Sequence, residues 1–135
     1  MSRVLVIDDE TIVATILSYA FDTKGYETLV ADGGRAGIEL AREERPDAIV
    51  LDLMMPTVSG LDVLRELRKD RATKHVPILV LTAVTMSDEH NKCLSGGADM
   101  VMTKPFDPQD IAAAVETMLA RDLQNTRGKV GRLPA

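Results

Sequence analysis

Five positions in this chain carry side chains that can bind a divalent cation or react with a phosphoryl group. Each comes one or two residues after a short apolar run: Asp8, Asp9, Asp52, Thr82 and Lys104. Carboxylates bind hard cations and can attack phosphorus, whereas a hydroxyl and an ammonium can hold phosphoryl oxygens. This chemistry requires the side chains to meet, so the elements before them decide the interpretation.

The apolar runs before these residues are short and rich in β-branched side chains, and segments with helical spacing separate them, which predicts buried parallel strands. They are Val4–Ile7, Ala48–Leu51, Ile78–Leu81 and Met100–Met102, and Thr28–Ala31 reads as an outer strand. Five β–α units in sequence predict an α/β fold, a doubly wound five-stranded parallel sheet. In such sheets the carboxyl ends of the strands line one crevice, where the five side chains would meet.

The helical segments have predicted faces and ends. In the first, an inward apolar stripe is expected from Ile12, Ile16 and Ala20 with Val13, Leu17 and Phe21, ending near Gly25. Ser59 is expected to cap the third helix, and Asp107-Pro108 to open the last. The sparse apolar pattern of 86–95 predicts a loosely held fourth helix, ending at Gly96-Gly97. The pattern stops near Asp122, which predicts a domain over 1–122 and a flexible tail or linker start over 123–135.

Composition narrows the class of protein. A chain of 135 residues with a net charge of −5 fits one small acidic domain, and it argues against direct nucleic-acid binding by this domain. No signal peptide or membrane-spanning apolar stretch is expected. The single cysteine, Cys93, fits a reducing, cytoplasmic setting.

Asp8, Asp9 and Asp52 would repel one another at one edge of the sheet. Without a cation, the pKa of at least one should rise; Mg²⁺ would relieve the repulsion and leave room for a phosphoryl oxygen. Asp52 is then the candidate nucleophile, with Lys104 as its charged partner. Taken singly, each residue has a plainer explanation: a helix cap for Asp8 and Asp9, a turn for Asp52, a strand end for Thr82 and an exposed loop for Lys104.

Taken together, these residues resemble the receiver domain of two-component response regulators. The resemblance runs from Arg3 to about Asp122, and further matching positions are Pro56, Gly60, Ala83 and Pro105. It implies a flavodoxin-like sheet with strand order 2-1-3-4-5 and a regulatory domain that assists its own phosphorylation, not an enzyme.

The resemblance also implies residue roles. Asp52 would accept a phosphoryl group from a histidine kinase or phosphotransfer protein. Asp9, Asp52 and the backbone carbonyl of Met54 would bind Mg²⁺ directly, and Asp8 through water. Thr82 and Lys104 would hold the phosphoryl oxygens, with a cis bond between Lys104 and Pro105.

Switching would then reshape the surface of the fourth helix, fifth strand and fifth helix. That surface would contact a downstream protein target or output domain, or a second copy in a phosphorylation-dependent homodimer.

This chain departs from the family at the fifth strand, where Val101 replaces the usual aromatic residue, so the usual aromatic flip cannot operate. Met54 and Val84 flank the site with apolar side chains. We expect them to hinder an attacking water and prolong the phosphorylated state.

Three alternatives stay open at this point. A Mg-dependent phosphatase of the haloacid dehalogenase type would need a second aspartate two residues after Asp52, where this chain has Met54. A flavin carrier would need a phosphate-cradling loop after the first strand, where Asp8-Asp9-Glu10 would repel phosphate. The complete acidic set argues against a degenerate receiver that takes no phosphate.

Overall fold

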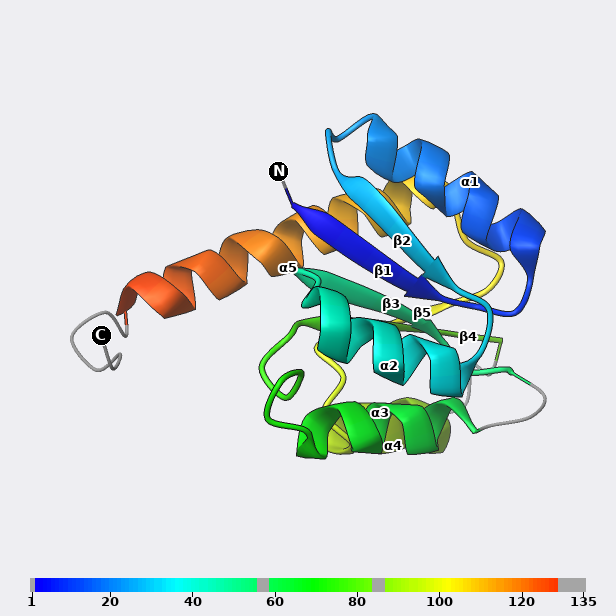
Figure 1. Cartoon of the computed structure of the whole chain (residues 1–135). Coiled ribbons are helices and arrows are strands. Elements are labelled where there is room, and N and C mark those ends of the chain that lie inside the picture. The colour runs from blue at the N-terminus through cyan, green and yellow to red at the C-terminus, as the bar shows by residue number, and fades with distance from the viewer. Residues whose placement is uncertain (1, 56–58, 84–86, 129–135) are drawn as a thin grey trace.

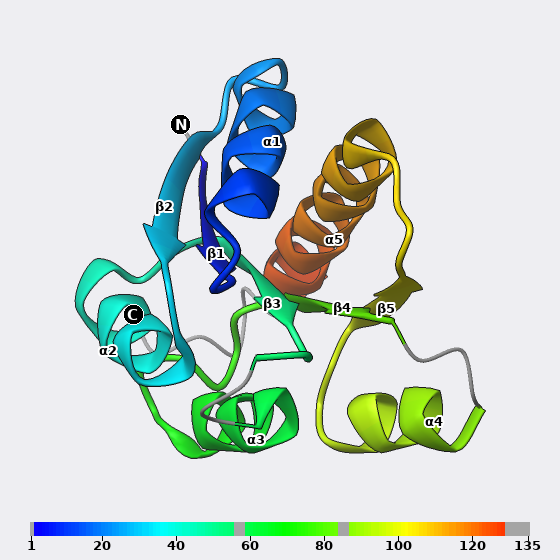
Figure 2. The ribbon, with the colours of Figure 1, turned by 90° about the vertical axis from the view of Figure 1, so that its right-hand side faces the viewer.

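A computed structural model describes residues 2–55, 59–83 and 87–128 and contains one five-stranded parallel sheet with the order β2-β1-β3-β4-β5. The strands are β1 (Arg3–Ile7), β2 (Glu27–Ala31), β3 (Ala48–Asp52), β4 (Ile78–Thr82) and β5 (Met100–Thr103). The helices are α1 (Thr11–Asp22), α2 (Gly34–Glu44), α3 (Gly60–Lys69), α4 (Ser87–Ser95) and α5 (Pro108–Gly128). Helices α1 and α5 cover one face of the sheet and α2, α3 and α4 the other (Figures 1 and 2). The predicted doubly wound fold and strand order are confirmed.

The core has two layers because successive side chains of a strand point to opposite faces. In β1, Leu5 and Ile7 pack toward α2 and α3, whereas Val4 and Val6 pack toward α1 and α5. All four are fully buried. The continuous apolar runs in the sequence follow from this burial on both faces.

Helix α1 is turned differently from the expectation. Leu17, Ala20 and Phe21 are buried as predicted, but Ile12 is 74% exposed and Ile16 is also exposed. Tyr19, at 71%, continues the same outer face. The inward stripe was therefore wrong for Ile12 and Ile16, and α1 presents an apolar ridge to the surface.

The helix ends agree with the sequence in part. Asp107 caps α5 through its side chain, which accepts a hydrogen bond from Gln109 N–H at 2.8 Å, whereas Ser59 precedes α3 without a side-chain cap. Gly25 adopts a φ of 78°, two residues beyond the Thr23 cap of α1.

Helix α5 continues to Gly128, so the predicted end of the helical pattern near Asp122 is wrong, and the last turns project beyond the sheet (Figure 1). The boundary at 122 stays a prediction. Helix α4 ends at Ser95 before Gly96-Gly97, as expected. No helix in the described ranges combines the length and apolar content needed to cross a membrane.

A partly buried arginine closes the amino-terminal edge of the sheet. Arg68 on α3 donates hydrogen bonds to the carbonyls of Gly97 (2.8 Å) and Val76 (2.6 Å) and to the Asp99 carboxylate (2.8 Å). Asp99 also accepts a hydrogen bond from Ile78 N–H at 2.8 Å. These bonds tie α3 to the start of β4 and to the loop before β5.

Candidate functional site

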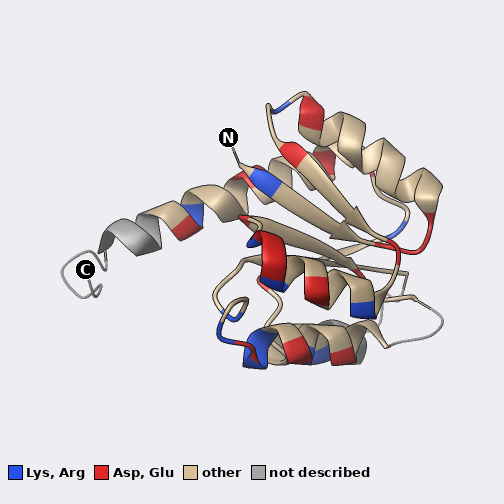
Figure 3. Ribbon diagram, in the orientation of Figure 1, with Lys and Arg blue, Asp and Glu red and all other residues tan. Residues whose placement is uncertain are grey.

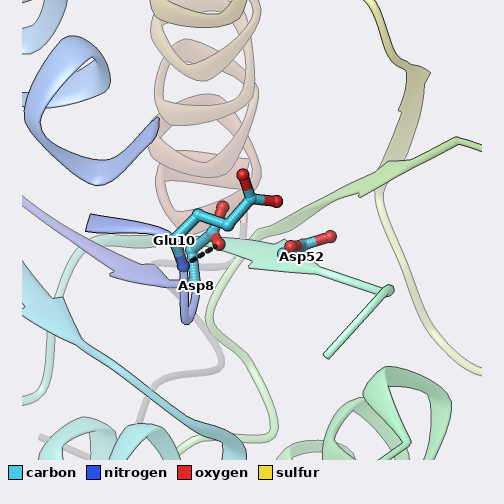
Figure 4. Close-up of side chains that lie close together, drawn as sticks. All are labelled: Asp8, Glu10 and Asp52. Carbon is cyan, nitrogen blue, oxygen red and sulfur yellow. Dashed lines mark hydrogen bonds between the residues drawn. The ribbon is translucent and has the colours of Figure 1, made fainter. Parts of the chain in front are cut away.

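The register of the strands places two of the predicted site residues, Asp8 and Asp52, side by side. Ile7 of β1 pairs with Leu51 of β3, so Asp8 and Asp52 follow at equivalent positions on neighbouring strands. The figure shows both carboxylates at this carboxyl edge (Figure 4). The predicted convergence of carboxylates from the first and third sheet segments is confirmed for these two residues.

In each of the two carboxylates, one oxygen accepts hydrogen bonds. Asp52 Oδ1 accepts hydrogen bonds from Met54 N–H at 3.0 Å and from Lys104 Nζ at 3.2 Å. Asp8 Oδ1 accepts a hydrogen bond from Glu10 N–H at 2.8 Å. The ion pair between Lys104 and Asp52 supplies the charged partner that burial of Asp52 requires.

The second oxygen of each carboxylate has no partner. Asp8 is 2% exposed and Asp52 is 1% exposed, and Asp8 Oδ2 and Asp52 Oδ2 are buried without a hydrogen bond. Burial, reinforced by the negative charge of Asp52, raises the pKa of Asp8 to about 6. The sequence-based expectation that one pKa rises is confirmed. An unpaired buried oxygen is costly, so this pair is suited to a bound cation.

A third acidic side chain joins the pair, but it is not the predicted one. Carboxylate oxygens of Asp8, Glu10 and Asp52 lie within 4.8 Å of one another (Figure 4). Asp9 is exposed and does not belong to this group among the described residues. The role of Asp9 as a direct metal ligand stays a prediction. Spacing alone could not reveal Glu10, because its position depends on how an exposed side chain turns.

The other predicted residues lie at the same edge of the sheet. Thr82 is buried at the end of β4, and its carbonyl accepts a hydrogen bond from Lys104 N–H at 2.8 Å. Ala83 follows it and is exposed. The predicted cis bond between Lys104 and Pro105 is confirmed. The phosphoryl-binding roles of Thr82 and Lys104 stay predictions.

The remaining predicted positions differ in their surroundings. Val101 in β5 is partly buried and packs against the core layer beneath α2 and α3. Met54 exposes its side chain beside Asp52. Pro56 and Val84 lie outside the described residues.

Comparison of this chain with known proteins identifies the family to which this site and this sheet order belong. The response regulator receiver domain model matches residues 4–116. The chain belongs to this family. The receiver domain is a signalling domain of two-component systems, and no finding supports the haloacid dehalogenase-type phosphatase, whose second aspartate is replaced by Met54.

Curated relatives are transcriptional response regulators. The chain is 39% identical over 119 residues to the alkaline phosphatase synthesis transcriptional regulatory protein PhoP of Bacillus subtilis, covering 88% of this chain and 49% of PhoP. It is 35% identical to the phosphate regulon transcriptional regulatory protein PhoB of Pseudomonas aeruginosa, covering 87% of this chain and 52% of PhoB. The chain therefore spans about half the length of the curated relatives it matches.

Solved structures agree with the fold. The Vibrio cholerae chemotaxis protein CheY4 matches with a TM-score of 0.82 and 29% identity, covering 87% of this chain and 98% of CheY4. The receiver domain of the Francisella response regulator 1452 matches with a TM-score of 0.83 and 30% identity, covering 90% and 98% of the two chains.

Proposed function

We propose that this receiver domain accepts a phosphoryl group on Asp52 from a phosphohistidine donor in the presence of Mg²⁺, and passes the signal through a changed protein-binding surface. The observation that carries the proposal is the buried Asp52 carboxylate, with one oxygen held by Lys104 and the other unpartnered. An oxygen of Asp52 forms the bond to phosphorus while the bond from phosphorus to the imidazole nitrogen breaks. That nitrogen keeps the bonding electron pair.

The protein's own groups prepare this reaction. Met54 N–H and Lys104 fix the orientation of the Asp52 carboxylate, and fixed positioning contributes much of the catalysis of phosphoryl transfer. Lys104, whose side chain is mostly buried, supplies a positive charge that can move from the carboxylate to a phosphoryl oxygen.

The carboxylates fit a divalent metal ion. Asp8 Oδ2 and Asp52 Oδ2 are unpartnered oxygens of the type that Mg²⁺ prefers, and we propose that both residues hold the ion, with Asp9 and the Met54 carbonyl as further ligands. When bound, Mg²⁺ would neutralise negative charge on the phosphoryl oxygens.

The phosphohistidine donor, a histidine kinase or a histidine phosphotransfer protein, is proposed to dock on α1. Ile12, Ile16 and Tyr19 lie on one exposed face of this helix, and α1 begins three residues after Asp8. An exposed apolar ridge of this kind is typical of protein interfaces, and this one borders the site.

Output is proposed to run through α4, β5 and α5 to a downstream protein, an output domain or a second copy of the domain. The carbonyl of Thr82 is bonded to the backbone of Lys104, so a shift at Thr82 reaches the end of β5 directly. The partly buried Val101 leaves this strand without the aromatic side chain that the family usually moves.

The proposed function is tested with acetyl phosphate, which carries a transferable phosphoryl group, in the presence of Mg²⁺. Intact-mass spectrometry should show that the wild type gains one phosphoryl group. A chelator added before the reaction should prevent this gain, and hydroxylamine, which cleaves acyl phosphates, should reverse it. Asp52→Asn should gain none. Asp32→Asn, at an exposed aspartate directly after β2, is the matched control and should behave as the wild type. Equal phosphorylation of Asp52→Asn would contradict the proposal.

A further inference from the structure

Glu10 lies at the phosphorylation site without a role in the proposed function. It precedes α1 but makes no side-chain cap to that helix. Its side chain is 61% exposed, and Oε1 lies 3.9 Å from Lys104 Nζ. Its carboxylate belongs to the group that includes the buried Asp8 and Asp52, as the close-up shows (Figure 4).

Glu10 changes the charge that an incoming phosphodonor meets. Lys104 is shared between Asp52 at 3.2 Å and Glu10 at 3.9 Å, so one ammonium faces more than one carboxylate. Acidic residues cluster where β1 meets α1 (Figure 3). Asp8 and Asp52 are buried and unpartnered on one oxygen each, which marks the place where the donor's phosphoryl group and its cation belong. The exposed Glu10 therefore lies at the entrance, and its charge repels an anionic donor at short range.

We propose that Glu10 is a specificity-determining residue that slows phosphorylation of Asp52 by small anionic phosphodonors and so reserves the site for a donor presented by a protein. A protein donor gains binding free energy from contacts far from the phosphoryl group, and these offset the repulsion. A small donor has no such contacts. This inference rests on the proposed function of Asp52.

Two small donors with different charge separate this effect from a general change in reactivity. Acetyl phosphate carries about two negative charges at neutral pH and releases acetate, which keeps the electron pair of the broken P–O bond. Phosphoramidate carries about one net negative charge, because its nitrogen is protonated. It releases ammonia as the P–N bond breaks. In both reactions the Asp52 oxygen forms the new bond to phosphorus.

The test compares the wild type with Glu10→Gln at saturating Mg²⁺. Removing one charge should raise the phosphorylation rate constant about threefold with phosphoramidate and about tenfold with acetyl phosphate, because the repulsion scales with donor charge. The difference between the two proteins should shrink in 0.5 M salt, which screens exposed charges. Glu10→Asp keeps the charge and should stay closer to the wild type.

Controls make each result decisive. Glu43→Gln changes the net charge by the same amount as Glu10→Gln. Glu43 is exposed on α2, next to Glu44, which pairs with Arg3 at the opposite edge of the sheet. The phosphorylation rates of Glu43→Gln should therefore match those of the wild type. Mg²⁺ affinity, measured by calorimetry, should fall by no more than about tenfold in Glu10→Gln, because the removed charge also attracts the cation, and saturating Mg²⁺ keeps this loss out of the rates.

Equal acceleration with both donors, no acceleration, or a loss of Mg²⁺ affinity of a hundredfold or more, which would make Glu10 a metal ligand, would overturn the role of Glu10. If the wild type binds Mg²⁺ but neither protein is phosphorylated, the function proposed for Asp52 falls as well.

Discussion

The two edges of the sheet differ in how the protein pairs their charged side chains. At the amino-terminal edge, Arg68 donates hydrogen bonds to three backbone carbonyls and to the Asp99 carboxylate, and Asp99 in turn accepts a hydrogen bond from Ile78 N–H of β4. At the carboxyl edge, Asp8 and Asp52 each keep a buried oxygen without a partner. The Arg68–Asp99 pair has its hydrogen-bond partners within the protein and supports the fold. The carboxyl edge is left incomplete, which costs stability and creates the capacity to bind a cation and react.

Removing Arg68 should give the largest loss of stability at the amino-terminal edge. Arg68→Ala would leave the carbonyls of Gly97 and Val76 without their side-chain donor and Asp99 without its ion pair, so the free energy of unfolding should fall by about 2–3 kcal/mol. Urea denaturation measures the loss. Arg65→Ala, on the exposed side of α3, is the control and should change stability by less than about 0.5 kcal/mol. Similar losses in both variants would show that the Arg68 contacts contribute nothing special.

Asp8→Asn should raise the free energy of unfolding, whereas Arg68→Ala lowers it. Because the folded-state pKa of Asp8 is about 6 against 3.8 in the unfolded chain, ionisation of Asp8 lowers native stability as pH rises between these values. In chelator, Asp8→Asn should therefore be more stable than the wild type by about 1–3 kcal/mol at pH 7, and by almost nothing at pH 4. Urea denaturation at both pH values checks this. A gap that does not depend on pH would disprove this account of the carboxylate.

A substitution on the exposed face of α1 tests whether the phosphohistidine donor reaches the carboxyl edge of the sheet by docking on this helix. Ile16→Ser should reduce phosphotransfer from a phosphorylated histidine phosphotransfer protein about tenfold, the cost of losing one good interface contact. Phosphorylation by acetyl phosphate should stay unchanged, because that donor needs no docking. Equal losses with the two donors would place the defect in the site and not on α1.

An effect of the same size as that of Ile16→Ser is expected for the lifetime of the phosphorylated state. Met54 exposes an apolar side chain beside Asp52, and it offers no hydrogen bond to orient an attacking water. Met54→Asn should speed dephosphorylation roughly tenfold, which corresponds to about 1.4 kcal/mol, and Val84→Glu should act in the same direction. Loss of the phosphoryl mass after donor removal gives the rates. Slower decay in these variants than in the wild type would end the hypothesis.

Sequence patterns predicted the parts of the molecule that depend on burial and register. Strands β1, β3 and β4 were readable because nearly all of their residues are buried on both faces, as Ile7 and Leu51 are. The meeting of Asp8 and Asp52 then followed from equivalent positions on neighbouring parallel strands. The pairing of Lys104 with Asp52 was predictable because a buried carboxylate needs a partner.

Other features leave no clear sequence signal. Apolar residues occupy both sides of α1, so spacing alone could not say that Ile12 would face outward. Arg68 binds backbone carbonyls, which have no residue type to recognise. The last turns of α5 extend beyond the sheet, and a search for an apolar face could not detect them.

The length of α5 has a mechanical consequence. Met118 is the last buried residue of this helix among those whose side chains are described, and the helix runs on to Gly128, roughly 15 Å further at 1.5 Å per residue. A rigid rod of that length magnifies rotation at its base, so a tilt of about 10° would carry its tip roughly 2.6 Å sideways. Small adjustments beside β5 would thus be converted into displacement well outside the domain.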